Sequence, residues 1–387
     1  MKIKEIRHLS VPVTGNIANA VVNFSEHTIS LVAVITDEVR NGRPVTGIAF
    51  DSIGRFAQGG IIEQRMVPRL MAAKPESLLA ADGAFDCARV YACIMRNEKP
   101  GGHGDRAAAC GALELAFWDL NAKLRDEPAY LTISRAFGTT PVTSGQPVYA
   151  AGGYYYPQDG VERLKQEIRR YKDMGYSAYK MKIGGASLSE DTARIEAALQ
   201  VAESGANLAV DVNGRFDLEQ AQVYAKAISP YKLRWYEEIG DPLDYELNRV
   251  MAETYDGPIA TGENLFSTQD ARNLLRYGGM RKNKDIFQMD PGLSYGLTEF
   301  SRMITLVEQA GINRKFIYPH GGHLINLHIS TALDLGGCEA YPGVFEPFGG
   351  YSDECKVIDG RIHPGSSPGF GIERKNELKP HIARLLA

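Results

Sequence analysis

From about residue 146 onward, strand-like segments alternate with helical stretches, and this repeat constrains the fold more than any other feature. The helical stretches include VERLKQEIRRYKDM, EDTARIEAALQVAES and LEQAQVYAKAI. The strand-like segments read PVYAAGGY, AYKMKI, LAVDVN, LRWYEE, PIATGEN, DIFQMD, KFIYPH and CEAYPG. Such alternation implies parallel strands joined by crossover helices. About eight units predict an α/β fold of the (β/α)8, TIM-type barrel class, although the last helix of the ring is poorly marked.

The first 125 residues read instead as an α+β region. KIKEIRHLSVPV and HTISLVAVITDEV have the pattern of strands, and GALELAFWDLNAKL (111–124) has that of a helix. This helix carries one apolar stripe at helical spacing, formed by Leu113, Ala116, Phe117 and Leu120. Two Gly-rich loops, 50–60 and 96–106, lie where binding residues often occur. We therefore divide the chain into 1–125, 126–350 and 351–387, and expect the last part to pack back on the first.

Charge and composition favour a small-molecule partner. The 387 residues carry a formal net charge of −4, which argues against nucleic acid as the main partner. No apolar run reaches the length of a signal peptide or a transmembrane helix, so we expect no membrane partner. An odd number of cysteines without a CxxC pattern fits a reduced, cytoplasmic setting. These cysteines are Cys87, Cys93, Cys110, Cys338 and Cys355.

Ionisable residues end nearly every strand-like segment of the repeat. In chain order they are Lys182, Asp211, Glu237, Glu263, Asp290, His320 and Glu339. Because catalytic groups of this fold lie at the carboxyl ends of the strands, we expect these side chains to meet in one cleft.

Three of these residues, Asp211, Glu237 and Glu263, predict a metal site. Converging carboxylates repel one another, and their pKa values rise unless a cation lies between them. A set of oxygen ligands favours a hard divalent ion, Mg²⁺ before Zn²⁺. The alternative is that one or two of them form salt bridges or are solvated, and we interpret the neighbouring Glu238 and Asp241 in that way.

Two lysines on one strand, Lys180 and Lys182, lie one residue apart, so both side chains point to the same face. A lysine near another cation and a metal ion has a lowered pKa and can act as a base. We interpret Lys182 as the base and Lys180 as the neighbouring cation. The alternative is that the pair neutralises the carboxylates, and this role is compatible with catalysis.

His320 and Asp290 end adjacent strand-like segments. A carboxylate that accepts from one imidazole nitrogen orients the ring and raises its basicity. We therefore predict that His320 is a second acid–base group, opposite Lys182. The other histidines, including His323 and His328 on the following helix, we interpret as structural.

Taken together, these residues resemble the enolase superfamily, in its mandelate racemase-like branch. The resemblance rests on the KxK pair at 180–182, the three carboxylates, the Asp290–His320 pair and Glu339, with GALELAFWDL and PGFGIE as further motifs. It implies Mg²⁺, a modified barrel, an N-terminal capping domain whose loops choose the substrate, and removal of a proton α to a carboxylate.

Within that branch, YKMKIGG, WYEEIGDP, YPHGGH and EAYPGVFEP are similar to the D-tartrate dehydratase subgroup. The usual motif has proline directly after the second Glu, whereas this chain has EEIGDP, which marks a subgroup and keeps Glu237 in register. The resemblance implies an acid-sugar dehydratase, a hydro-lyase that converts D-tartrate to oxaloacetate. Lys182 would remove the α proton and His320 would protonate the leaving β-hydroxyl. Glu339 would hydrogen-bond a substrate oxygen, in a protonated or water-bridged form.

A second carboxylate on the substrate would need a counter-charge from the capping loops. The cationic candidates are Arg55 and Lys99, and Asn19 could supply a neutral hydrogen bond. Tyr154 and Tyr341, near the ends of the first and last strands of the repeat, are further candidate contacts.

Other functions remain open from the sequence. The same Lys and His pair could serve a racemase or epimerase, or a dehydratase for a hexonate or pentonate. A metal-binding barrel without catalysis is disfavoured because no ligand or base is lost. A class II aldolase is disfavoured because the carboxylate set contains no histidine for zinc. We expect a homo-oligomer.

Overall fold

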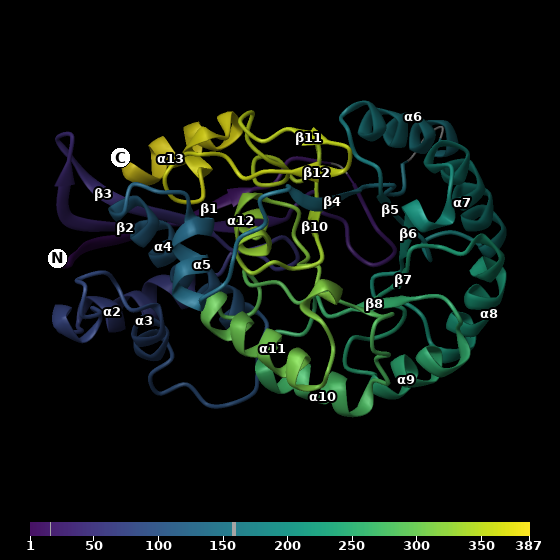
Figure 1. Cartoon of the computed structure of the whole chain (residues 1–387), viewed down its shortest axis with the longest axis horizontal. Helices are drawn as coiled ribbons and strands as arrows, with labels where there is room; N and C mark the ends of the chain where they lie inside the picture. The colour runs from purple at the N-terminus through teal and green to yellow at the C-terminus, as the bar shows by residue number, and fades with distance from the viewer. Residues whose placement is uncertain (16, 157–159) are drawn as a thin grey trace.

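The computed structural model describes residues 1–15, 17–156 and 160–387 (Figure 1). The chain begins with a three-stranded antiparallel sheet in the order β1-β2-β3. Its strands are β1 (Ile3–Pro12), β2 (Thr28–Arg40) and β3 (Arg43–Phe50). The two strand-like segments of the sequence are confirmed as β1 and β2, whereas β3 was not anticipated. Helices follow: α1 (Gly59–Ile61), the π-helix Ile62–Met66, α2 (Val67–Met71), α3 (Cys87–Ile94), α4 (Asp105–Leu124) and α5 (Ala129–Phe137).

The helix expected at 111–124 is confirmed as part of α4, whose apolar stripe is buried together with every other residue from Ala107 to Ala122. The reason is that α4 lies between two layers. On one side, β3 approaches so closely that a Cβ on Gly47 would lie 2.1 Å from the carbonyl oxygen of Ala116. On the other side, a Cβ on Gly111 would lie 2.6 Å from the carbonyl oxygen of Gly292. Glycine at both positions therefore allows the helix to contact the two layers at once.

The second sheet is parallel through its main part and provides the strand ends predicted to carry the site. Its order is β11-β12-β4-β5-β6-β7-β8-β9, and β10 also pairs with β4. The parallel strands are β4 (Gln146–Ala151), β5 (Tyr179–Lys182), β6 (Leu208–Asp211), β7 (Tyr236–Glu237), β8 (Ile259–Thr261), β9 (Ile286–Phe287) and β10 (Cys338–Ala340). A short antiparallel hairpin, β11 (Val357–Ile358) and β12 (Arg361–Ile362), extends the edge at β4.

The seventh strand-like segment, KFIYPH, is not a strand, and the prediction fails there. Residues Arg314–Phe316 form a 3-10 helix, and Ile317 forms only an isolated parallel bridge with Phe287 of β9. Pro319 lacks the N–H that a central strand needs, which explains why no continuous ladder forms. Single hydrogen bonds still hold this segment beside its neighbours: Tyr318 N donates to Phe287 O at 2.9 Å. The ladder of a barrel is thus interrupted between β9 and β10.

Helices cover the outside of the parallel strands, as Figure 1 shows for α6 to α11. They are α6 (Gly160–Asp173), α7 (Leu188–Ala202), α8 (Leu218–Ile228), α9 (Tyr245–Thr254), α10 (Thr268–Tyr277), α11 (Leu297–Gln309) and α12 (Leu324–Ala332). None of the described helices combines the length and the apolar character needed to cross a bilayer.

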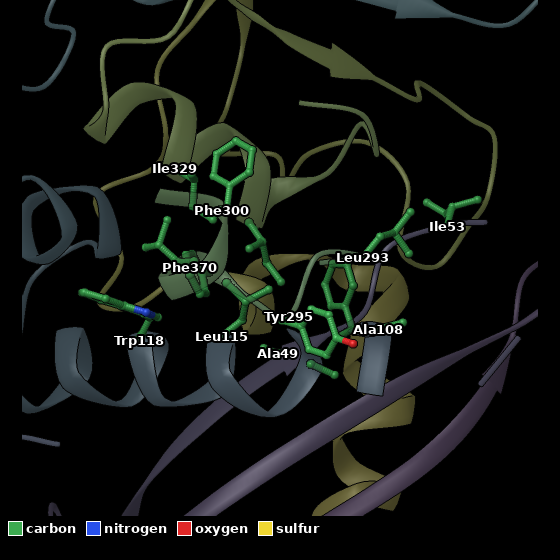
Figure 2. Packing of buried hydrophobic residues seen from close by; sticks show 14 of the residues in the cluster. Ala49, Ile53, Ala108, Leu115, Trp118, Leu293, Tyr295, Phe300, Ile329 and Phe370 are labelled. Carbon is green, nitrogen blue, oxygen red and sulfur yellow. The ribbon is translucent and has the colours of Figure 1, made fainter. Parts of the chain in front are cut away.

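The C-terminal segment lies against the first sheet and α4. Its last helix, α13 (Lys379–Leu386), accepts a hydrogen bond at Leu385 O from Arg7 of β1 (3.3 Å). Phe370 N donates to the buried carboxylate of Asp119 on α4 (2.7 Å). Figure 2 shows that Phe370 belongs to one apolar cluster with residues of β3, α4, α11 and α12. One hydrophobic core therefore joins the antiparallel sheet to the parallel one.

Candidate active site at the strand ends

Strand register places the first three ionisable residues side by side. In the parallel pairing of β5 with β6, Lys182 lies opposite Asp211, and in that of β6 with β7, Asp211 lies opposite Glu237. Glu263 follows the end of β8, the next strand. The expected convergence of these residues is therefore a direct consequence of pairing adjacent strands at the same level.

The carboxylates of Asp211, Glu237 and Glu263 each offer one oxygen atom, and these atoms lie within 4.8 Å of one another. The first two are fully buried, and the side chain of Glu263 is 12% exposed. The Glu263 Oε2 atom is buried and has no hydrogen-bond partner among the described residues. An unpaired carboxylate oxygen beside two further carboxylates is the donor set of a hard divalent cation, so the residues fit Mg²⁺.

Both lysines of β5 are buried and reach the same carboxylate, which confirms that they share one face. Lys182 Nζ lies 2.5 Å and Lys180 Nζ 3.3 Å from Asp211 Oδ2. Lys180 also donates to Glu237 Oε1, and its Nζ lies 2.7 Å from Glu339 Oε1. Lys180 is thus an ion-pair partner of three carboxylates as well as a neighbour of Lys182.

The charges of this cluster are linked. Although burial opposes a charge on Lys180, the carboxylates of Glu237 and Glu339 raise the pKa of its ammonium group above the ordinary value. Burial also opposes a charge on Asp211, but the two lysines hold the pKa of this carboxyl group below its usual range. In contrast, burial raises the pKa of Glu237 to about 8, with Lys180 opposing the shift and Asp211 adding to it. The lysines therefore do not neutralise all of the carboxylates.

His320 lies on the other side of the carboxylates, next to Asp290. Its Nδ1 lies 3.1 Å from Asp290 Oδ2, and its Nε2 lies 2.9 Å from the hydroxyl of Tyr341. Nε2 is also 3.7 Å from Glu263 Oε2. Although burial opposes the charged form, the carboxylates of Glu263 and Asp290 raise the pKa of His320 to about 10. The ring is therefore an imidazolium at neutral pH, with one nitrogen fixed by Asp290.

Glu339 on β10 lies between Lys180 and the backbone of Gly321, and its protonated or water-bridged role toward a substrate stays a prediction. Its Oε2 accepts a hydrogen bond from Gly321 N (2.9 Å), and Lys180 lies beside Oε1. Burial opposes the charge, but Lys180 and His320 hold the pKa of Glu339 below its usual range. These neighbours favour the form of Glu339 that accepts hydrogen bonds.

The predicted substrate-binding residues of the first 125 residues differ in their distance from the strand ends. Arg55 donates from Nη2 to Asn264 Oδ1 (3.1 Å), next to Glu263, and its Nε is buried without a partner among the described residues. Asn19 Oδ1 is occupied by the backbone N–H groups of Val21 and Val22, which leaves its amide nitrogen for other contacts.

Lys99 is exposed, and no contact of its side chain with the site residues is found in the described part of the chain. Its backbone oxygen accepts from Arg106 (2.9 Å). Tyr154 is buried, and the ammonium group of Lys182 lies 5.4 Å from the centre of its ring. The structure thus brings Tyr154, Tyr341 and Arg55 to the strand ends but does not bring Lys99 there.

Two residues of the site were missed or misread. Trp235 donates from Nε1 to Glu237 Oε2 (2.6 Å), and its position two residues before Glu237 could have indicated the shared strand face. Glu238 is buried rather than solvated, and it accepts a hydrogen bond from Asn264 (2.8 Å) instead of forming a salt bridge. Its backbone has a positive φ of 42°, which turns this side chain away from the alternation of the strand. Asp241, in contrast, is exposed, as expected.

The sequence matches a known protein family over most of the parallel-sheet region. The family model described as enolase C-terminal domain-like matches residues 163–378, which is more than half of the chain. The chain belongs to the enolase superfamily. The match supports placement in the mandelate racemase-like branch, as the motifs of the sequence indicated.

Relatives in this superfamily include enzymes that act on acid sugars. The L-talarate/galactarate dehydratase of Salmonella typhimurium is 24% identical over 371 residues, covering 95% of this chain and 87% of that protein. The 3,6-anhydro-alpha-L-galactonate cycloisomerase of Streptomyces coelicolor is 29% identical over 279 residues, covering 70% of each protein.

Solved structures of this superfamily have the same fold. The L-talarate dehydratase of Polaromonas sp. JS666, complexed with Mg and L-glucarate, has a TM-score of 0.77 at 22% identity, covering 98% of this chain and 96% of that one. A racemase of Streptomyces coelicolor A3(2) with bound magnesium has a TM-score of 0.76 at 22% identity, covering 98% of both chains. These likenesses support an α/β fold with a parallel sheet and a capping region.

Proposed function

We propose that this chain is a Mg²⁺-dependent acid-sugar dehydratase, a hydro-lyase whose substrate is D-tartrate and whose product is oxaloacetate. The observation that carries the proposal is the placement of Lys182 and His320 at two ends of one carboxylate triad. Lys182 contacts Asp211, and His320 lies near Glu263. A base and an acid so placed suit the removal of a proton from one carbon and of a hydroxyl group from the next.

The metal site supports this assignment. Asp211, Glu237 and Glu263 would hold Mg²⁺, and the bound ion would supply positive charge to the substrate carboxylate as the neighbouring carbon becomes negative. The unpaired Glu263 oxygen and the magnesium in related structures both support this choice of ion.

The residues of the chain perform the two bond-breaking steps. Lys182 accepts the α proton, and the electrons of the broken carbon–hydrogen bond form a carbon–carbon double bond as the β-hydroxyl leaves. His320 Nδ1 is committed to Asp290, so Nε2 is the atom that gives a proton to the leaving hydroxyl, which departs as water. The resulting enol tautomerises to the 2-keto acid.

Aromatic and cationic side chains near the strand ends support a diacid substrate. Aromatic rings lie next to the two acid–base groups. The ring centre of Phe345 is 5.8 Å from that of Tyr154 and 4.9 Å from that of Tyr341. The ring centre of Phe24, between β1 and β2, is 4.8 Å from that of Phe345. The buried Nε of Arg55 has no partner among the described residues, and Arg55 contacts Asn264, the residue after Glu263, so it is suited to a second carboxylate.

A six-carbon aldarate is the second candidate, because the Salmonella L-talarate/galactarate dehydratase aligns with 95% of this chain. The test is a panel of tartrate isomers, aldarates, hexonates and pentonates with Mg²⁺, monitored for release of 2-keto acid. Turnover of D-tartrate supports the proposal. Turnover of an aldarate or hexonate alone would refute the substrate and keep the reaction. Solvent deuterium at the α carbon without any keto acid would favour a racemase or epimerase instead.

A further inference from the structure

Behind His320 lies a row of buried polar side chains that the proposed reaction does not use. Asn326, near the start of α12, donates from Nδ2 to Asp290 Oδ1 (3.2 Å) and to the backbone oxygen of His320. A carboxylate and a carbonyl oxygen can only accept, so the amide nitrogen must face them. Asn326 thus contacts both members of the Asp290–His320 pair at once.

These contacts decide which oxygen of Asp290 serves the histidine. Oδ1 accepts from Asn326 Nδ2 and from the backbone N–H of Gly292 (2.8 Å). Oδ2 remains for His320 Nδ1, at 3.1 Å. Asp290 and His320 are both buried, so without Asn326 the carboxylate would lose one of the donors that fix its rotation.

His323 and Ser52 extend the row to the capping sheet. Burial lowers the pKa of His323 to about 4, so the ring is neutral. Its Nδ1 lies 3.5 Å from the backbone N–H of Asn326, which can only donate, so Nε2 carries the hydrogen. Nε2 therefore donates to Ser52 Oγ, 3.1 Å away and two residues beyond the end of β3. This contact was not foreseen when His323 was interpreted as a purely structural residue.

Two glycines allow Ser52 to lie close to the Asp290–His320 pair. A Cβ on Gly321, whose φ is +99°, would lie 2.2 Å from Ser52 Oγ and 2.5 Å from Asp290 Oδ2. A Cβ on Gly292 would lie 3.0 Å from Ser52 Cβ. Any larger residue at these positions would separate the capping sheet from the pair.

We propose that Asn326 is a positioning residue for the His320–Asp290 pair, and that Ser52 and His323 connect this pair to the capping sheet. This inference rests on the proposed role of His320 as the acid of the dehydration. It predicts that the row affects the rate of the step that uses His320 more than it affects substrate binding.

The kinetic test compares Asn326→Leu with Thr331→Val, a nearly isosteric control on the same helix whose buried hydroxyl has no partner among the described residues. We expect Asn326→Leu to lower kcat by about 10- to 100-fold with KM changed by about twofold at most. Ser52→Ala should lower kcat by only about two- to fivefold, since Asn326 still contacts Asp290. Thr331→Val should retain both constants.

A second measurement does not depend on turnover. The low-field ¹H NMR signal of the His320 Nδ1–H is identified by its loss in His320→Asn, in protein labelled with ¹⁵N-histidine. We expect Asn326→Leu, or the milder Asn326→Ser if the first variant does not fold, to broaden or shift this signal, and Thr331→Val to leave it unchanged.

The outcomes separate the two proposals. A wild-type signal and a wild-type kcat in a folded Asn326 variant would overturn the positioning role. If the wild-type protein converts none of the acids in the panel, the proposed function fails, and the ring signal alone then decides whether Asn326 positions His320.

Discussion

Two buried charge clusters in this chain differ in how their carboxylates are satisfied. Between α4 and the C-terminal segment, Asp119 pairs with Lys123 (2.5 Å) and accepts from the backbone N–H groups of Ile48 and Phe370, each at 2.7 Å. At the strand ends, Glu263 Oε2 is buried and accepts no hydrogen bond in the described part of the chain, and its cationic neighbour, His320 Nε2, lies 3.7 Å away. Both clusters are buried, so burial does not distinguish them.

The difference shows that a buried acceptor atom without a hydrogen bond distinguishes a binding site from a structural ion pair. Every oxygen of Asp119 has a donor within the protein, so this cluster is complete without a ligand. The strand-end cluster holds more carboxylate charge than Lys180 and Lys182 can neutralise, and a folded chain retains such a site at a cost in stability. We therefore expect substitutions in the two clusters to have opposite effects on activity and on stability.

The largest expected effect is that of Lys182→Ala on catalysis. Without the base, kcat for dehydration and the rate of α-proton exchange in D₂O should both fall by about a thousandfold or more. Keto-acid release and ¹H NMR of the substrate measure the two rates. A variant that keeps full α-proton exchange would show that another group removes the proton.

Glu263→Gln should remove function without removing stability. We expect an activity loss of at least about a hundredfold, because the third metal ligand is lost. In the absence of Mg²⁺ the free energy of unfolding should change by no more than about 1 kcal/mol, since a buried carboxylate oxygen without a hydrogen bond disappears while its 3.7 Å ion pair with His320 is also lost. Urea unfolding with and without Mg²⁺ measures this, and Mg²⁺ should no longer raise the midpoint. A strong destabilisation in the absence of Mg²⁺ would mean that Glu263 is a structural residue.

Asp119→Asn should behave in the reverse way. Breaking this buried pair leaves the Lys123 ammonium with less compensation, so we expect a loss of about 3 kcal/mol in the free energy of unfolding. The folded fraction should keep the wild-type kcat and the full stabilisation by Mg²⁺. Loss of the Mg²⁺ response in this variant would remove the distinction between the two clusters.

The smallest effect concerns His328, a buried histidine of α12 outside both clusters. Burial lowers its pKa from 6.5 to about 3, so the unfolded chain binds this proton more readily than the folded one. Its contribution to the free energy of unfolding is therefore complete above about pH 6.5 and is lost as the pH falls towards 3. At pH 5.5 the loss amounts to about 1.4 kcal/mol. His328→Asn should flatten the pH dependence of urea unfolding between pH 7.5 and 5.5 by about that amount. An unchanged slope would show that His328 is charged in the fold.

Much of the strand-end site followed from the sequence because parallel strands obey a simple rule. Nearly every strand-like segment of the repeat ends in an ionisable residue, and the pairing of adjacent strands brings Lys182, Asp211 and Glu237 into one row. Period-two alternation correctly placed Lys180 and Lys182 on one face. The roles of these residues as base, ligand and acid stay predictions, as does the division of the chain into 1–125, 126–350 and 351–387.

Other features depended on packing that no local pattern reports. KFIYPH has the composition of a strand, yet Pro319 and the neighbouring 3-10 helix prevent a ladder. The apolar stripe of α4 followed from local spacing, but the burial of its other faces depends on the two layers that enclose the helix. Glu238 was interpreted as a salt-bridge partner or a solvated residue, because neighbouring residues do not indicate the positive φ that turns its side chain into the protein.

The sequence by itself determined the strand–helix repeat and the residues at each strand end, since local periodicity and the handedness of crossover connections are properties of short segments. Only the tertiary structure decided which buried carboxylates have hydrogen-bond donors for all of their oxygen atoms. Contacts between segments far apart in the chain decide whether Asp119 finds donors, whether Glu263 lacks one and whether Ser52 reaches His323. Hydrogen bonds act over about 3 Å, so they are determined only when those segments are packed.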